Sequence, residues 1–194
     1  MPTCPTDLVE LSPGWACLDP AQPVSLPKTL SVFRRALSGV DVVTQSLGVS
    51  AGPEIIFGAT RIFSKATRVP VTAMEEAHVS RLICVTGFGA GDSRGHGGFL
   101  YTVAFHLLLA RVYDDKDVQE WIIRRSKLNW VIVRPVILTD GPKTNAYRAL
   151  VDPRDWTCGF ISRADVADFL VKQIDDDAFL HKTPVVTSPP YLEE

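Results

Sequence analysis

Three short apolar runs separated by helical stretches are the feature of this 194-residue sequence that most limits its fold. The runs are Val40–Ser46, Leu82–Thr86 and Trp130–Val133, and each has the length and composition of a strand buried on both faces. Buried strands that alternate with helices indicate right-handed βαβ units. The sequence therefore predicts an α/β fold: a parallel sheet with helices on both faces.

Apolar residues at helical spacing fill the segments between these runs. The predicted helices are 28–38, 59–78, Asp115–Arg125 and Arg163–Ile174. Pro70 is expected to kink or split the second helix, and Ser162 to cap the last one. The strand at Trp130–Val133 is expected to stop before Pro135, and Pro184–Thr187 predicts a last short strand.

The first residues differ from the rest because prolines recur every few positions there, and proline breaks helices and central strands. We expect an irregular proline-rich lead-in over residues 1–24. Residues 25–194 are expected to form a single domain, a size that can bury a sizeable core.

Charge and composition exclude several classes of protein. The chain has 20 Lys+Arg against 22 Asp+Glu, which gives none of the excess positive charge that nucleic-acid binders use. No apolar run approaches the roughly 20 residues that a membrane span needs, and no secretory signal is visible. The four cysteines lie far apart, and no cluster of histidines and cysteines suggests a metal site. We therefore expect a cytoplasmic protein with free thiols, and neither nucleic acid nor a membrane as a partner.

In an open α/β sheet, small molecules bind beyond the carboxyl ends of the strands. The residues directly after each buried run are therefore the candidate binding residues. They are Ser46, Leu47 and Gly48 after the first run, Thr86, Gly87 and Phe88 at the second, and Pro135, Val136 and Ile137 after the third.

A loop with six glycines in twelve residues, Gly87–Gly98, follows the second run. Its sequence, GFGAGDSRGHGG, contains neither the dinucleotide fingerprint nor a P-loop, so a surface loop and a ligand-facing lid both remain open. Asp92, Ser93, Arg94 and His96 could form a hydrolytic set. No nucleophile elbow surrounds the serine, which disfavours a hydrolase.

Lys116 lies near the start of the helix before the third run. A lysine there can reach a ribose hydroxyl and lower the pKa of a neighbouring proton donor. The alternative is a solvated lysine that pairs with Glu120, four residues on. Tyr113 is three positions earlier instead of four, so the sequence has no Tyr-x-x-x-Lys pair.

The order of these motifs resembles the atypical short-chain dehydrogenase/reductases, within them the NAD(P)H-binding, NmrA-like proteins and the flavin reductase–biliverdin reductase B type. The resemblance covers roughly residues 28–187. It rests on GVDVVTQSLG, RLICVTGFGAGDSRGHGG, the Lys116-x-x-x-Glu120 helix, SKLNWVIVRP and FISRADVADFL.

The resemblance implies a Rossmann-like domain that binds NADP or NAD and transfers hydride from the nicotinamide to a small carbonyl, flavin or quinone-like substrate. It implies catalytic roles for Thr86 and Lys116. The cofactor-binding residues that it implies are Ser46, Leu47, Gly48, Thr86, Gly87, Phe88, Lys116, Pro135, Val136 and Ile137, the last three lying beside the nicotinamide carboxamide.

The chain departs from the family at its start, where a glycine-rich turn would hold the pyrophosphate. Residues 1–27 contain a single glycine, Gly14. We therefore expect an N-terminally incomplete domain with weak cofactor binding. Its strand at Val40–Ser46 would be an exposed edge that can pair with a second copy. Two alternatives stay open: a non-catalytic module that binds a nucleotide or a partner, and an inactive truncated fragment.

Overall fold

The computed structural model describes residues 26–48, 61–96 and 110–189. Along these residues the α-helices and the parallel strands of the main sheet run in the order α1 (Leu26–Ala36), β1 (Val42–Gln45), α3 (Ile62–Ala77), β2 (Arg81–Val85), α5 (Ala110–Arg124), β3 (Asn129–Pro135), α6 (Arg163–Lys172) and β7 (Val185–Thr187). Three short strands, β4 (Ile137–Thr139), β5 (Arg148–Leu150) and β6 (Phe160–Ser162), lie between β3 and α6. Two single 3₁₀ turns complete the set, η2 (Gly91–Ser93) and η3 (Pro153–Asp155).

The main sheet has the strand order β1-β2-β3-β7-β5. The first four strands are mutually parallel, and β5 runs antiparallel to β7 at one edge. Gln45 is paired with Cys84, and Cys84 with Ile132, so β1, β2 and β3 run in step toward the same edge. A separate parallel pair, β4 and β6, extends from the end of β3.

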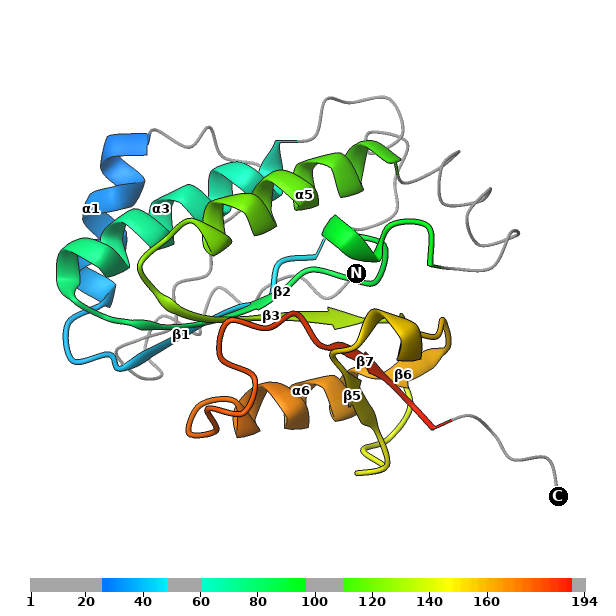
Figure 1. The fold of residues 1–194 in the computed structure, drawn as a ribbon. Coiled ribbons are helices and arrows are strands. Elements are labelled where there is room, and N and C mark those ends of the chain that lie inside the picture. Colours follow the sequence, from blue (N-terminus) through cyan, green and yellow to red (C-terminus); the bar gives the residue numbers. More distant parts are fainter. Residues whose placement is uncertain (1–25, 49–60, 97–109, 190–194) are drawn as a thin grey trace, which may run out of the picture.

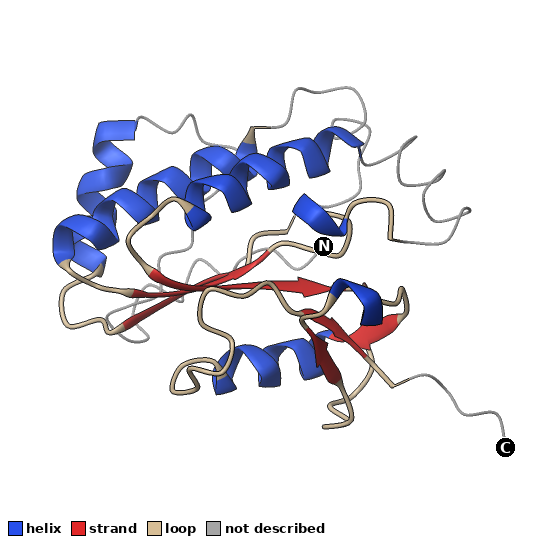
Figure 2. Cartoon of the chain, viewed as in Figure 1, coloured by secondary structure: helices blue, strands red, loops and turns tan. Residues whose placement is uncertain are grey.

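Helices cover both faces of the sheet: α1, α3 and α5 lie on one side and α6 on the other (Figures 1 and 2). Successive residues of a strand point to opposite faces. Leu82 therefore packs in the core beneath α3 and α5, while Ile83 packs with Phe169 of α6. Because both faces are covered, the inner strands are mostly apolar, although β3 carries the buried Arg134. The predicted α/β class with a mostly parallel sheet is confirmed.

Several predicted boundaries shift in the structure. Pro70 is buried inside α3, which runs as one helix, so of the predicted kink or split the split does not occur. The strand predicted to stop before Pro135 includes that residue, and Phe88 donates its N–H to the Pro135 carbonyl at 2.9 Å. Ser162 caps α6 as predicted, accepting the Asp165 N–H at 3.0 Å. The predicted lead-in over residues 1–24 lies outside the described residues.

The first strand lies at an edge of the sheet. Within the described residues, β1 pairs with β2 alone, and Val42 and Val43 are each partly buried against the opposite faces. In the same part of the chain, no helix is both long enough and apolar enough to span a membrane. Cys84 and Cys158 are free thiols there, the first buried and the second exposed.

Candidate functional site

The predicted binding residues meet at one edge of the sheet because β1, β2 and β3 are parallel and end together. Their exposure differs: Ser46 and Gly48 are exposed, whereas Thr86, Gly87 and Phe88 are buried. The structure therefore brings the three segments together, with accessible residues mainly after β1.

A buried ion pair forms the base of this edge. The Arg134 guanidinium donates from Nε to Glu120 Oε1 at 3.0 Å and from Nη2 to Oε2 at 2.6 Å. Thr86 donates its hydroxyl to Glu120 Oε1 at 2.9 Å. Arg134 is 0% and Glu120 2% exposed, so each charge depends on the other for compensation. Sequence reasoning did not find this pair.

Lys116 stands one turn before Glu120 on α5. Its ammonium donates to the Thr86 carbonyl oxygen and lies 5.0 Å from the centre of the Phe63 ring and 5.3 Å from that of Tyr113. Burial lowers the pKa of Lys116 to about 8, against the opposing influence of Cys84 and Glu120. The alternative of a solvated lysine paired with Glu120 is wrong, because Glu120 is committed to Arg134.

The first half of the glycine loop is closed onto α5. Gly91 donates its N–H to Asp117 Oδ1 at 2.6 Å, and Asp92 contacts Arg134 at 2.5 Å. Gly91 has a φ of +56°, and a Cβ built there would lie 2.5 Å from both Glu120 Oε2 and Arg134 Nη2. Only glycine permits this approach. The last two residues of the predicted loop lie outside the described part of the chain.

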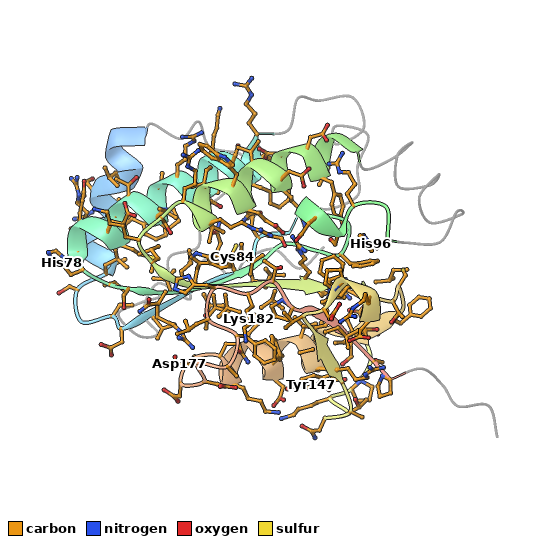
Figure 3. All side chains as sticks on the ribbon, in the orientation of Figure 1. His78, Cys84, His96, Tyr147, Asp177 and Lys182 are labelled. Atoms are coloured by element: carbon orange, nitrogen blue, oxygen red, sulfur yellow. The ribbon has the colours of Figure 1, made fainter. Side chains whose placement is uncertain are left out.

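The serine of the proposed hydrolytic set has a structural role. Ser93 is buried, accepts the Gly89 N–H at 2.9 Å and donates to the Ala90 carbonyl at 2.7 Å. His96 lies at the outer side of this loop (Figure 3), with its ring 5.1 Å from that of Trp156. The hydroxyl is thus engaged by its own turn, which agrees with the case against a hydrolase.

Cys84 lies on β2 beneath α5, the helix that carries Lys116 and Gln119 (Figure 3). Gln119 donates to its sulfur at 3.2 Å, and burial raises the pKa of the thiol well above its usual range. A protonated, buried thiol is a poor nucleophile. Cys84 therefore belongs to the core beneath the site.

The N-terminus of α3 faces the same edge, because a helix that follows a parallel strand starts at the strand's carboxyl end. Asp115 of α5 accepts the N–H groups of Phe63 at 2.8 Å and Ser64 at 3.4 Å. The carboxylate thus occupies the position where a helix N-terminus can bind a phosphate. This cap could not be predicted from the sequence, because Asp115 and Phe63 are 52 residues apart.

The fit of a nicotinamide cofactor to these residues is partial. Lys116 supplies a cation at the expected place. The N–H groups of Val136 and Ile137, however, already donate to Val186 and Gly159, both at 3.2 Å. Ser46 and Gly48 fit as accessible residues after β1, whereas after β3 Val136 is buried and only Ile137 is exposed.

This parallel sheet, with a lysine at the carboxyl edge, defines a Rossmann-like NAD(P)-binding protein. A family model described as NAD(P)H-binding matches residues 27–177, so the chain belongs to the NAD(P)H-binding family. The NAD(P)H-binding family that the resemblance implied is thereby confirmed. A comparison with curated proteins found no match.

Solved structures share the fold at low sequence identity. ChuY, an anaerobilin reductase from Escherichia coli O157:H7, is 24% identical with a TM-score of 0.66, over 85% of this chain and 73% of that one. A short-chain dehydrogenase/reductase from Veillonella parvula in complex with NADP is 19% identical with a TM-score of 0.65, over 83% and 69%. The oxidoreductase ylbE from Lactococcus lactis is 18% identical with a TM-score of 0.67, over 87% and 71%. At these identities the solved structures show the shared fold.

Proposed function

We propose that this chain is an NAD(P)H-dependent reductase whose substrate is a small carbonyl, flavin or quinone-like molecule. The observation that carries the proposal is the place of Lys116, a cation fixed at the carboxyl edge of the sheet by the Thr86 carbonyl and two aromatic rings. When bound, NADPH or NADH supplies the hydride. Ser46, Leu47 and Gly48 would flank the cofactor where β1 ends, and Lys116 would hold a ribose hydroxyl.

Thr86 connects the two charged groups of the site. Its carbonyl accepts from Lys116, and its hydroxyl donates to Glu120. A hydroxyl has one proton to donate. Thr86 therefore polarises a substrate carbonyl only if this proton turns from Glu120 to the substrate, whereas its carbonyl positions Lys116 in either state.

The test is a fluorescence titration of the full chain with NADPH and NADH, followed by their oxidation in the presence of aldehydes, flavins and quinones. We expect binding of one or both cofactors and oxidation with at least one substrate class. Lys116→Met should weaken binding about tenfold, as expected for one charge-assisted hydrogen bond. The exposed Lys127→Met is the matched control. Absence of any fluorescence change at saturating NADPH and NADH would refute the proposal.

Thr86→Val and Thr86→Ser separate the two roles of Thr86. If its hydroxyl polarises the substrate, the valine variant loses turnover at unchanged cofactor affinity, and the serine variant retains both. If the valine variant instead loses stability together with turnover, the role of the hydroxyl is to support Glu120.

A non-catalytic nucleotide-binding module is the second candidate function. It is favoured by three observations: the Thr86 hydroxyl is engaged, the N–H groups after β3 are paired, and Asp115 closes the N-terminus of α3. Such a module would bind NADPH or NADH without oxidising it across the substrate panel. The same occupied donors lead us to expect weak binding, because each charge-assisted bond that is missing costs about 1.5–3 kcal/mol.

A further inference from the structure

Arg134 contacts two carboxylates and still has an unused donor. Glu120 accepts from Nε at 3.0 Å and from Nη2 at 2.6 Å, and Asp92 contacts Nη2 at 2.5 Å. Nη1 is buried and has no hydrogen-bond partner among the described residues. A buried donor without a partner is uncommon in a folded protein, and this one belongs to the charged base of the carboxyl edge.

The two carboxylates differ in how firmly they are held. Glu120 is buried with Arg134 and compensates its charge, so it cannot leave without exposing or stranding a buried ion. The Asp92 side chain is 57% exposed and reaches Arg134 from the glycine loop. Asp92 can turn into water by a change of its own side-chain rotamer, at little cost in solvation.

The chemistry of the position that Asp92 occupies favours a small carboxylate. A planar guanidinium can form two parallel hydrogen bonds to one carboxylate through Nη1 and Nη2. Arg124 contacts Asp92 at 3.3 Å and brings a second positive charge to the same place. The Trp156 ring lies 5.6 Å from the guanidinium carbon of Arg134, which limits the size of a ligand there. Exchange of Asp92 for a free carboxylate would leave the charges of the cluster balanced.

We propose that the Asp92 carboxylate is an internal stand-in that blocks a binding site for small carboxylates on Arg134. A free carboxylate takes its place at Nη2 and adds the bond to Nη1 that Asp92 does not make. Asp92 turns into solvent, while Glu120 keeps both of its hydrogen bonds. No covalent bond changes and no cofactor is needed, so this site goes beyond the proposed reductase function.

The test is a titration of the isotope-labelled full chain with sodium acetate, followed by NMR spectroscopy without NADPH or NADH. The amide signals of Gly91 and Asp92 and the Nε–H signal of Arg134 report on the site. Sodium chloride at the same concentrations measures the effect of ionic strength alone. We expect acetate to shift these signals until they saturate, and chloride to cause no comparable shift.

Asp92→Asn removes the competing charge from the loop. A site that is blocked about nine-tenths of the time binds its ligand about tenfold more weakly, so this variant should bind acetate about tenfold more tightly than the unaltered chain. Asp92→Ser is a second variant that should show the same gain. Arg134 itself is left unaltered, because its removal would leave the Glu120 charge buried and unpaired.

Asp114→Asn is the matched control, because Asp114 is an exposed aspartate that pairs with Arg94. It should bind acetate as the unaltered chain does. The proposal would be overturned if acetate binds the two Asp92 variants no more tightly than the unaltered chain, or if chloride reproduces the shifts. The assay contains no nicotinamide cofactor, so its result is independent of whether the chain binds or oxidises NADPH.

Discussion

At the scale of single residues, Gly91 lies where a side chain has no room. Its backbone passes directly over the Arg134–Glu120 pair with a φ of +56°, a conformation that side chains disfavour. Gly91→Ala would force its methyl group within 2.5 Å of both partners, neither of which can move without exposing a buried charge. We expect unfolding in urea to show a loss of about 2 kcal/mol or more.

Gly95→Ala is the matched control in the same loop. Gly95 also has a positive φ, +87°, but a Cβ built there has no atom within 4 Å. Its substitution should cost only the conformational strain, about 1 kcal/mol. If both variants lose the same free energy of unfolding, the close approach of Gly91 to the ion pair adds nothing to the cost of its substitution.

The position of Lys116 could be predicted from the sequence, and its environment could not. Residues that directly follow a buried strand must lie at the carboxyl edge, so the sequence alone placed Thr86 and Val136 near each other. Helical spacing also predicted a Lys116–Glu120 pair. Arg134, 14 residues after Glu120 and facing α5 from β3, takes that carboxylate instead, a competition that only the tertiary structure reveals.

At the scale of elements, α3 takes its N-terminal cap from another helix. Its own N-cap residue, Arg61, makes no side-chain cap, and Asp115 of α5 accepts the first N–H groups. Asp115→Ala should destabilise the fold by about 1–2 kcal/mol, because it leaves buried donors unpaired and removes a charge that favours the helix dipole. Asp114→Ala removes an exposed neighbour that pairs with Arg94, and should change stability by less than about 0.5 kcal/mol. Urea unfolding distinguishes the two, and equal effects would contradict the role of the cap.

The start of α6 should give the fold a dependence on acidic pH. Asp165 accepts the N–H groups of Thr144 and Asn145 and the Thr144 hydroxyl. Burial raises the pKa of its carboxyl, and these hydrogen bonds more than offset it, so the pKa is lower than usual. A carboxyl with a lowered pKa stabilises the fold above the unfolded-state value of about 3.9 and loses this contribution as pH falls toward the folded-state value.

Asp165→Asn should therefore reduce the free energy of unfolding more at pH 7 than at pH 3, as measured by urea unfolding at both values. The exposed Asp175→Asn is the control and should show no such difference. If the Asp165 variant loses the same free energy of unfolding at both pH values, Asp165 stabilises the fold through its shape and packing and not through its charge.

The long elements could be predicted, and so could the short buried strand β7, whereas the short exposed strands could not. The inner strands and the helices carry periodic apolar patterns, and all of those in the described residues appear in the structure within a few residues of the predicted ends. β4, β5 and β6 have three residues each, and Ile137, Leu138, Arg148 and Phe160 among them are exposed. A three-residue segment exposed on one side has no period to detect.

At the scale of the whole molecule, the two edges of the main sheet differ. One edge is the antiparallel strand β5, and the other is β1, which within the described residues has β2 as its single neighbour. β1 presents Val42 and Val43 to the two faces and carries no charged residue to discourage pairing. We expect two copies of the chain to associate through this strand, which also leads into Ser46, Leu47 and Gly48, the residues proposed to flank the cofactor.

Thr44→Lys tests this association because Thr44 is the exposed residue of β1, and a lysine on an edge strand opposes pairing. Sedimentation equilibrium of the unaltered chain should show a dimer fraction that grows with concentration, and the Thr44 variant should remain monomeric at the same concentrations. Asn129→Lys adds the same charge at an exposed position on the inner strand β3 and should dimerise like the unaltered chain. If the Thr44 variant still dimerises, the interface lies elsewhere, because a lysine on the edge strand should block pairing through β1. If both variants lose dimerisation equally, the added net charge and not the blocked strand edge is the cause.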